Sequence, residues 1–88
     1  MTSVQLLTSE GCTPCMRVKR IIEEIQLEIR NVAVEEIDFA STSGSKLAIQ
    51  NNIAYPPAVF VDGKLVAKGK IYAEQMIEAI RTENGSEN

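Results

Sequence analysis

The chain has 88 residues, enough for one small domain with a hydrophobic core. Hydrophobic residues make up 44% and charged residues 24%, a balance that excludes disorder over most of the length. The formal net charge of −3 argues against a nucleic-acid-binding surface, and no apolar run approaches the ~20 residues of a membrane span.

The first expected element is a buried strand at Val4–Thr8, which ends at the polar turn Ser9–Gly11. The N-terminus has no basic stretch followed by a long apolar run, so we expect no signal peptide and a cytoplasmic location.

A helix is expected from Thr13 or Pro14, because apolar residues then recur at alternating steps of three and four and share one face. They are Cys15, Val18, Ile22, Ile25 and Ile29. Pro14 suits the first turn, where its missing N–H costs nothing. Asn31 is expected to stop this helix.

The second half of the pattern begins with a strand at Val32–Asp38, expected at a sheet edge because its two glutamates need water. Residues 41–45 offer several N-caps for a short helix through Lys46–Gln50. Asn52 is expected at the left-handed position after this helix, with Ile53 as the apolar residue that follows.

Two further strands are expected at Pro57–Val61 and Lys64–Lys68, joined by an Asp62–Gly63 hairpin turn. A last helix follows Gly69. Its apolar face consists of Ala73, Met76, Ile77 and Ile80. The element order is therefore βαβαββα, in one domain over residues 1–82 with a flexible polar tail at 83–88.

The two cysteines of the chain, Cys12 and Cys15, are separated by two residues at the expected start of the first helix. A Cys-x-x-Cys at the helix N-terminus of a βαβ pattern is typical of a dithiol/disulfide redox site. The free N–H groups and the positive dipole end stabilise an anion, so we expect a Cys12 pKa below the ordinary ~8.5. Glu10 opposes thiolate formation and should keep that pKa from the lowest values.

Two other interpretations of the cysteine pair stay open, namely inert thiols and a shared metal site. A tetrahedral zinc site needs four ligands, whereas this chain has two cysteines and no histidine. Metal binding would therefore need carboxylates or a second subunit. The alternative function is a dimeric module that binds a metal or an iron–sulfur cluster through paired Cys12/Cys15 sites.

These motifs, in this order, resemble the thioredoxin/glutaredoxin superfamily, and most closely its short glutaredoxin-like thioredoxins of archaea and anaerobic bacteria. The resemblance covers about residues 4–81. It rests on the motif Cys12-Thr13-Pro14-Cys15, the segment Pro57–Gly63, and Asn52–Ile53 leading into Pro57. It implies an α/β, thioredoxin-like fold with a four-stranded mixed sheet flanked by three helices.

The resemblance also implies a small protein disulfide oxidoreductase and redox carrier that reduces disulfides of partner proteins. Cys12 is then the nucleophile and Cys15 the resolving thiol. The active group is the Cys12–Cys15 disulfide, with no bound cofactor and no metal. We expect roles in electron transport and cell redox homeostasis, an upstream reductase, a monomer, and no nucleic-acid or membrane partner.

The superfamily has a cis-proline at the start of the third strand, and two prolines here compete for it. The spacing to Gly63 favours Pro57, whereas the aromatic Tyr55 would favour a cis bond to Pro56; we choose Pro57. Pro56 would then face the substrate without an N–H to donate. Substrate contacts are expected from Thr13, Pro14, Met16, Tyr55 and Pro56. A core-capping role for Tyr55 and a core-filling role for Met16 stay open.

The chain departs from both branches of the superfamily at specific positions. Leu6 stands where thioredoxins carry a buried aspartate that deprotonates the second cysteine. Ser9–Glu10 and Ala67–Lys70 replace the segments with which glutaredoxins bind glutathione. Glutathione has two carboxylates that need donors, so its use by this chain is doubtful.

Overall fold

The computed structural model describes residues 1–85, and within them the chain forms seven elements. They are β1 (Thr2–Thr8), α1 (Thr13–Glu28), β2 (Val32–Asp38), α2 (Thr42–Gln50), β3 (Ala58–Val61), β4 (Lys64–Lys68) and α3 (Ala73–Gly85). This is the expected βαβαββα order. The strands form one mixed sheet in the order β2-β1-β3-β4, so β2 is an edge strand as expected.

The register of the strands places four chain segments at one end of the sheet. β1 runs parallel to β2 with Thr8 opposite Asp38, and antiparallel to β3 with Leu7 opposite Ala58. Ala58 in turn pairs with Lys68 of β4. The ends of β1, β2 and β4 and the start of β3 therefore meet at what we call the Thr8 end of the sheet.

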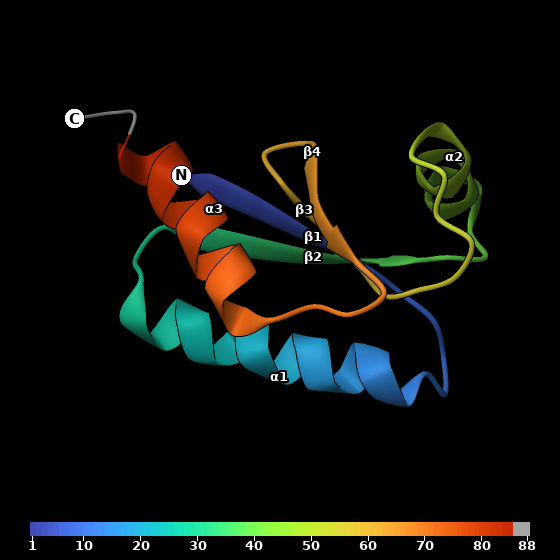
Figure 1. Cartoon of the computed structure of the whole chain (residues 1–88), viewed down its shortest axis with the longest axis horizontal. Helices are drawn as coiled ribbons and strands as arrows, with labels where there is room; N and C mark the ends of the chain where they lie inside the picture. The colour runs from blue at the N-terminus through green and yellow to red at the C-terminus, as the bar shows by residue number, and fades with distance from the viewer. Residues whose placement is uncertain (86–88) are drawn as a thin grey trace.

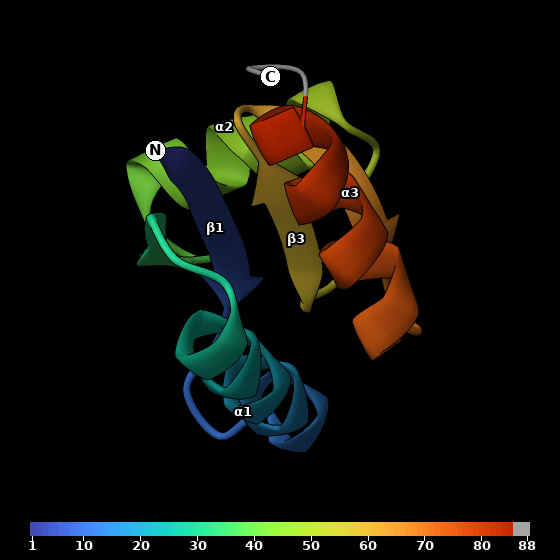
Figure 2. The ribbon, with the colours of Figure 1, turned by 90° about the vertical axis from the view of Figure 1, so that its left-hand side faces the viewer.

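The helices divide the core into two clusters, one on each face of the sheet. One cluster packs β1 and β3 against α1 and α3, and the other packs their opposite faces against α2, which lies away from α1 in Figures 1 and 2. Alternation of side chains along a strand explains this division, because Leu6 and Val59 face the first cluster while Leu7 and Phe60 face the second. Full burial of each such side chain contributes about 1.5–3 kcal/mol.

The end of α1 differs slightly from the sequence expectation, whereas α2 lies where its capping segment predicts. α1 ends at Glu28, and Ile29 is already extended although it still packs against the core. Asn31 lies in the left-handed region (φ 62°), where it turns the chain toward β2. α2 begins at Thr42 and ends at Gln50, and of the expected capping segment 41–45 it is Ser41 that caps the helix, because its side chain accepts the Gly44 N–H at 3.0 Å.

Two turns have the conformations that their residues predict. Asn52 has φ 55°, and the Ile53 N–H donates to the Ala48 carbonyl at 2.8 Å, which closes the C-terminus of α2. Asp62 and Gly63 have φ values of 49° and 83°, the positive values that a two-residue hairpin loop needs.

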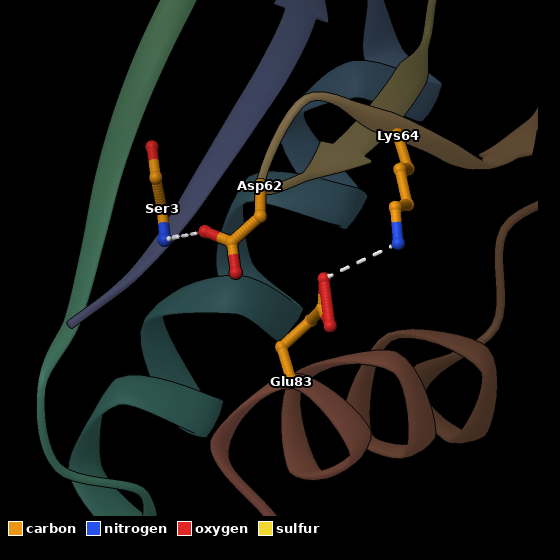
Figure 3. A network of polar contacts seen from close by, with 4 residues as sticks. All are labelled: Ser3, Asp62, Lys64 and Glu83. Carbon is orange, nitrogen blue, oxygen red and sulfur yellow. Dashed lines mark hydrogen bonds and ion pairs between the residues drawn. The ribbon is translucent and has the colours of Figure 1, made fainter. Parts of the chain in front are cut away.

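The end of the sheet opposite Thr8 is tied together by polar contacts (Figure 3). Asp62 accepts the Ser3 N–H at 2.8 Å, and Lys64 forms an ion pair with Glu83 at 3.8 Å. The expected tail at 83–88 therefore needs a correction at its start, because α3 continues to Gly85 and Glu83 contacts the hairpin. Residues 86–88 lie outside the described residues. No helix between residues 1 and 85 is long and apolar enough to cross a membrane.

Candidate active site

Cys12 occupies the N-cap position of α1, with extended backbone angles (φ −84°, ψ 104°). Its sulfur accepts the Cys15 N–H at 3.1 Å, and its carbonyl accepts the Met16 N–H at 3.2 Å. The Ser9 carbonyl accepts the Cys12 N–H at 3.2 Å, across a turn in which Gly11 has φ 76°. The local sequence thus places the Cys12 sulfur against the free N–H groups that begin the helix.

Cys12 and Cys15 form a disulfide, with their Cα atoms 5.2 Å apart. The two cysteines differ in access, since Cys15 is 1% exposed and Cys12 is partly exposed. The partly exposed Cys12 is therefore the sulfur that a partner can reach. Within residues 1–85 no group of three or more histidine, cysteine, aspartate or glutamate residues has a geometry that could hold a metal ion.

Pro57 lies at the same end of the sheet as the disulfide. It directly precedes Ala58, which pairs with Leu7, and the disulfide turn leaves the sheet one residue later at Thr8. The peptide bond between Pro56 and Pro57 is cis. The Pro57 side chain is buried and its carbonyl accepts the Gly69 N–H at 3.0 Å, so Pro57 also holds the segment after β4.

The other expected contact residues are open to solvent. Thr13 and Pro14 are exposed in the first turn of α1, and Pro56 is half-buried. Met16 is 61% exposed and Tyr55 is 65% exposed, so neither side chain fills the core. These side chains come from the start of α1 and from the loop before β3, two of the segments at the Thr8 end.

A groove of about 420 Å³ lies beside the disulfide, between α1 and β2. Cys15 and Met16 border it from α1, and Glu36 and Asp38 from β2. Lys19 also lines it and forms an ion pair with Glu36 at 3.1 Å. Sequence reasoning missed the β2 residues of this groove, although the parallel pairing of β1 and β2 in a βαβ unit could have indicated them.

The expected departures from the superfamily have clear structural counterparts. Leu6 is fully buried in the core cluster under α1. On the other side of the disulfide, Lys68 donates to the Asn52 carbonyl at 3.0 Å and Lys70 is exposed. The Arg17 guanidinium donates to the Ile71 carbonyl at 3.1 Å, so it fixes the segment before α3 to the first half of α1.

Comparison with known proteins agrees with this geometry. A thioredoxin-domain family model matches residues 2–82. Chloroplastic thioredoxin z superposes with a TM-score of 0.72 at 21% identity, covering 97% of this chain and 80% of that one. A mutant thioredoxin from Halobacterium salinarum NRC-1 gives 0.67 at 20% identity, covering 92% and 73%. The thioredoxin-like protein BC3987 gives 0.64 at 26% identity, covering 85% and 96%. No curated protein sequence matches the chain.

The solved structures share the fold, and the family model spans nearly the whole chain, including the disulfide motif. The chain therefore belongs to the thioredoxin family.

Proposed function

We propose that this thiol–disulfide oxidoreductase reduces disulfides in partner proteins and is itself regenerated by an upstream reductase. One observation carries the proposal: a partly exposed Cys12 sulfur at the N-terminus of α1 is bonded to a buried Cys15. A thiolate at Cys12 gains from the helix dipole and from the N–H that already points at its sulfur.

The reaction is a pair of thiol–disulfide exchanges starting from the reduced protein. The Cys12 thiolate attacks one sulfur of the partner disulfide, forms a mixed disulfide and releases the first partner thiolate, which takes up a proton. Cys15 then loses its proton and attacks the Cys12 sulfur, which releases the second partner thiol. The partner gains two electrons, and Cys12–Cys15 ends as a disulfide.

The residues around Cys12 receive positioning and docking roles in this proposal. Pro57 shapes the floor beside the disulfide, and the Pro56 carbonyl accepts a hydrogen bond from the partner backbone. Apolar contact comes from the exposed Met16 and Tyr55. Thr13 and Pro14 contribute the exposed surface of the first helical turn.

We place the reaction in the cytoplasm, where reduced thiols predominate, and we assign it to a monomer that needs no bound cofactor. Glutathione is a poor substrate in this scheme. Glu10 lies on one side of the disulfide, and Lys68 on the other side is already engaged with the Asn52 carbonyl. The cationic donors that two glutathione carboxylates require are therefore few.

The test is a comparison of two substrates at equal protein concentration. Reduction of insulin disulfides with dithiothreitol as the electron source should proceed readily, whereas a glutathione mixed disulfide should turn over poorly. The matched control is Cys12→Ser, which should abolish the insulin reaction. Efficient turnover of the glutathione mixed disulfide would contradict the substrate assignment.

A trapping experiment tests the roles of the two cysteines. Cys15→Ser should accumulate a mixed disulfide between Cys12 and insulin, because no second thiol is left to resolve it, and Cys12→Ser should not. The same preparations distinguish the dimeric metal module, since stoichiometric metal in anaerobically purified dimer would support that module instead.

A further inference from the structure

Charge is distributed unevenly across the Thr8 end of the sheet, with the disulfide in the middle. On the β2 side lie the carboxylates of Glu10, Glu36 and Asp38, which all line the groove beside Cys15. On the β4 side lie Lys68 and Lys70, next to the Gly69 N–H that donates to the Pro57 carbonyl. A partner segment that crosses Cys12 therefore meets negative charge on one flank and positive charge on the other.

The groove on the β2 side has room for a long side chain. Its volume is about 420 Å³, and its three carboxylates and single ammonium, Lys19, give a formal charge of −2. Lys19 is held by Glu36 at 3.1 Å, so it leaves Glu10 and Asp38 without a cationic partner in the groove. The exposed Met16 side chain borders the same groove and offers apolar contact to an aliphatic stem.

We infer that the groove between α1 and β2 selects partner disulfides that are flanked by a lysine or arginine. The cationic head lies beside the Glu10 and Asp38 carboxylates, which have no cationic partner in the groove, and the stem covers Met16. The groove borders Cys15, so the residue that enters it must lie close in space to the partner's reacting cysteine. This inference rests on the proposed reduction of protein disulfides. It adds a preference for partners that carry a positive charge beside the reacting cysteine.

The test uses three disulfide-bonded peptides that differ at one residue beside the cysteine, which is lysine, glutamine or glutamate. The second-order rate constant for reduction by the dithiol protein is measured under single-turnover conditions. The lysine peptide should react about fivefold faster than the glutamate peptide at low salt. The ratio combines an attractive charge contact in the lysine peptide with a repulsive one in the glutamate peptide, both partly exposed to solvent. The ratio should approach one near 1 M salt, where the Debye length is ~3 Å.

Substitutions of the groove carboxylates test whether the charge preference arises in the groove. Combining Glu10→Gln with Asp38→Asn should reduce the lysine-to-glutamate ratio to about one or two, and it leaves the Lys19–Glu36 ion pair intact. The matched control is Glu35→Gln, because Glu35 also belongs to β2 but accepts from Gln5 on the opposite face of the sheet. It should leave the ratio unchanged. The rate with the glutamine peptide reports thiolate reactivity, so dividing by it removes any effect of the substitutions on Cys12 itself.

The outcomes separate this inference from the proposed function. If none of the peptides nor insulin is reduced, the proposed function fails. If all three peptides react at equal rates, disulfide reduction stands and the charge preference is overturned. A preference that survives the combined substitutions, or that Glu35→Gln abolishes equally, overturns the assignment to the groove.

Discussion

Replacing Gly44 by alanine should destabilise the protein, although alanine favours a helix over glycine by ~1 kcal/mol. Gly44 is buried in the first turn of α2 against the end of β2. A Cβ atom there would lie 2.8 Å from the Asp38 carbonyl carbon, still nearer its oxygen, and 3.0 Å from the Ser41 Oγ. The obstacle is backbone of an anchored strand end, so the helix start has to move.

The cost follows from the hydrogen bonds that such a movement breaks. The Asp38 carbonyl accepts from the Ser41 N–H at 3.0 Å and from the Ser41 hydroxyl at 2.6 Å. The same hydroxyl oxygen accepts the Gly44 N–H at 3.0 Å. Three bonds at ~1 kcal/mol each, less the ~1 kcal/mol gained in helix propensity, leave a net destabilisation of about 2 kcal/mol.

Guanidinium chloride unfolding of the oxidised protein, followed by far-UV circular dichroism, measures this difference. The matched control is Ser43→Ala, since Ser43 is exposed in the same turn and its hydroxyl makes only a long, 3.4 Å approach to the Ser41 Oγ. The control should change stability by less than about 0.5 kcal/mol. An unfolding midpoint for Gly44→Ala at or above that of the wild type would refute the reasoning.

Three further outcomes are expected. In the reduced protein, iodoacetamide near pH 7 should label Cys12 well before the buried Cys15, as peptide mass mapping would reveal; preferential labelling of Cys15 would reverse their roles. Gly63→Ala should cost about 1 kcal/mol in urea unfolding, because φ is 83° while no atom obstructs the Cβ, and an unchanged stability would contradict this. Arg17→Ala should lower the free energy of unfolding by about 1 kcal/mol and speed amide hydrogen exchange in the segment before α3, because the hydrogen bond to the Ile71 carbonyl is lost. Unchanged exchange in that segment would argue against this anchor.

Local sequence rules account for most of the elements and for the chemistry of the motif. The order of helices and strands, the hairpin at Asp62–Gly63 and the left-handed Asn52 follow from periodicity and from residues that tolerate positive φ. The placement of Cys12 at a helix N-terminus follows from the two-residue spacing and from Pro14 in the first turn. These features depend on neighbours within a few residues, so the sequence alone determines them.

Other features depend on contacts between segments far apart in the chain. The continuation of α3 past Thr82 brings Glu83 to Lys64, 19 positions earlier in the chain. Local helix propensity does not report this contact. The exposure of Met16 and Tyr55 likewise depended on which surfaces the sheet covers, so the sequence left both core and surface roles open.

The contrast between features set by local sequence and features set by long-range contacts is greatest at the active site. The sequence by itself determined that a dithiol begins the first helix and that two adjacent prolines lie where the third strand begins. Only the tertiary structure decided that Glu36 and Asp38 line a groove with Cys15, because parallel pairing aligns the ends of β1 and β2 across a connection of 23 residues, 9–31. Strand pairing joins segments that are far apart in the chain, and here it makes the exposed edge strand β2 one wall of the groove beside Cys15.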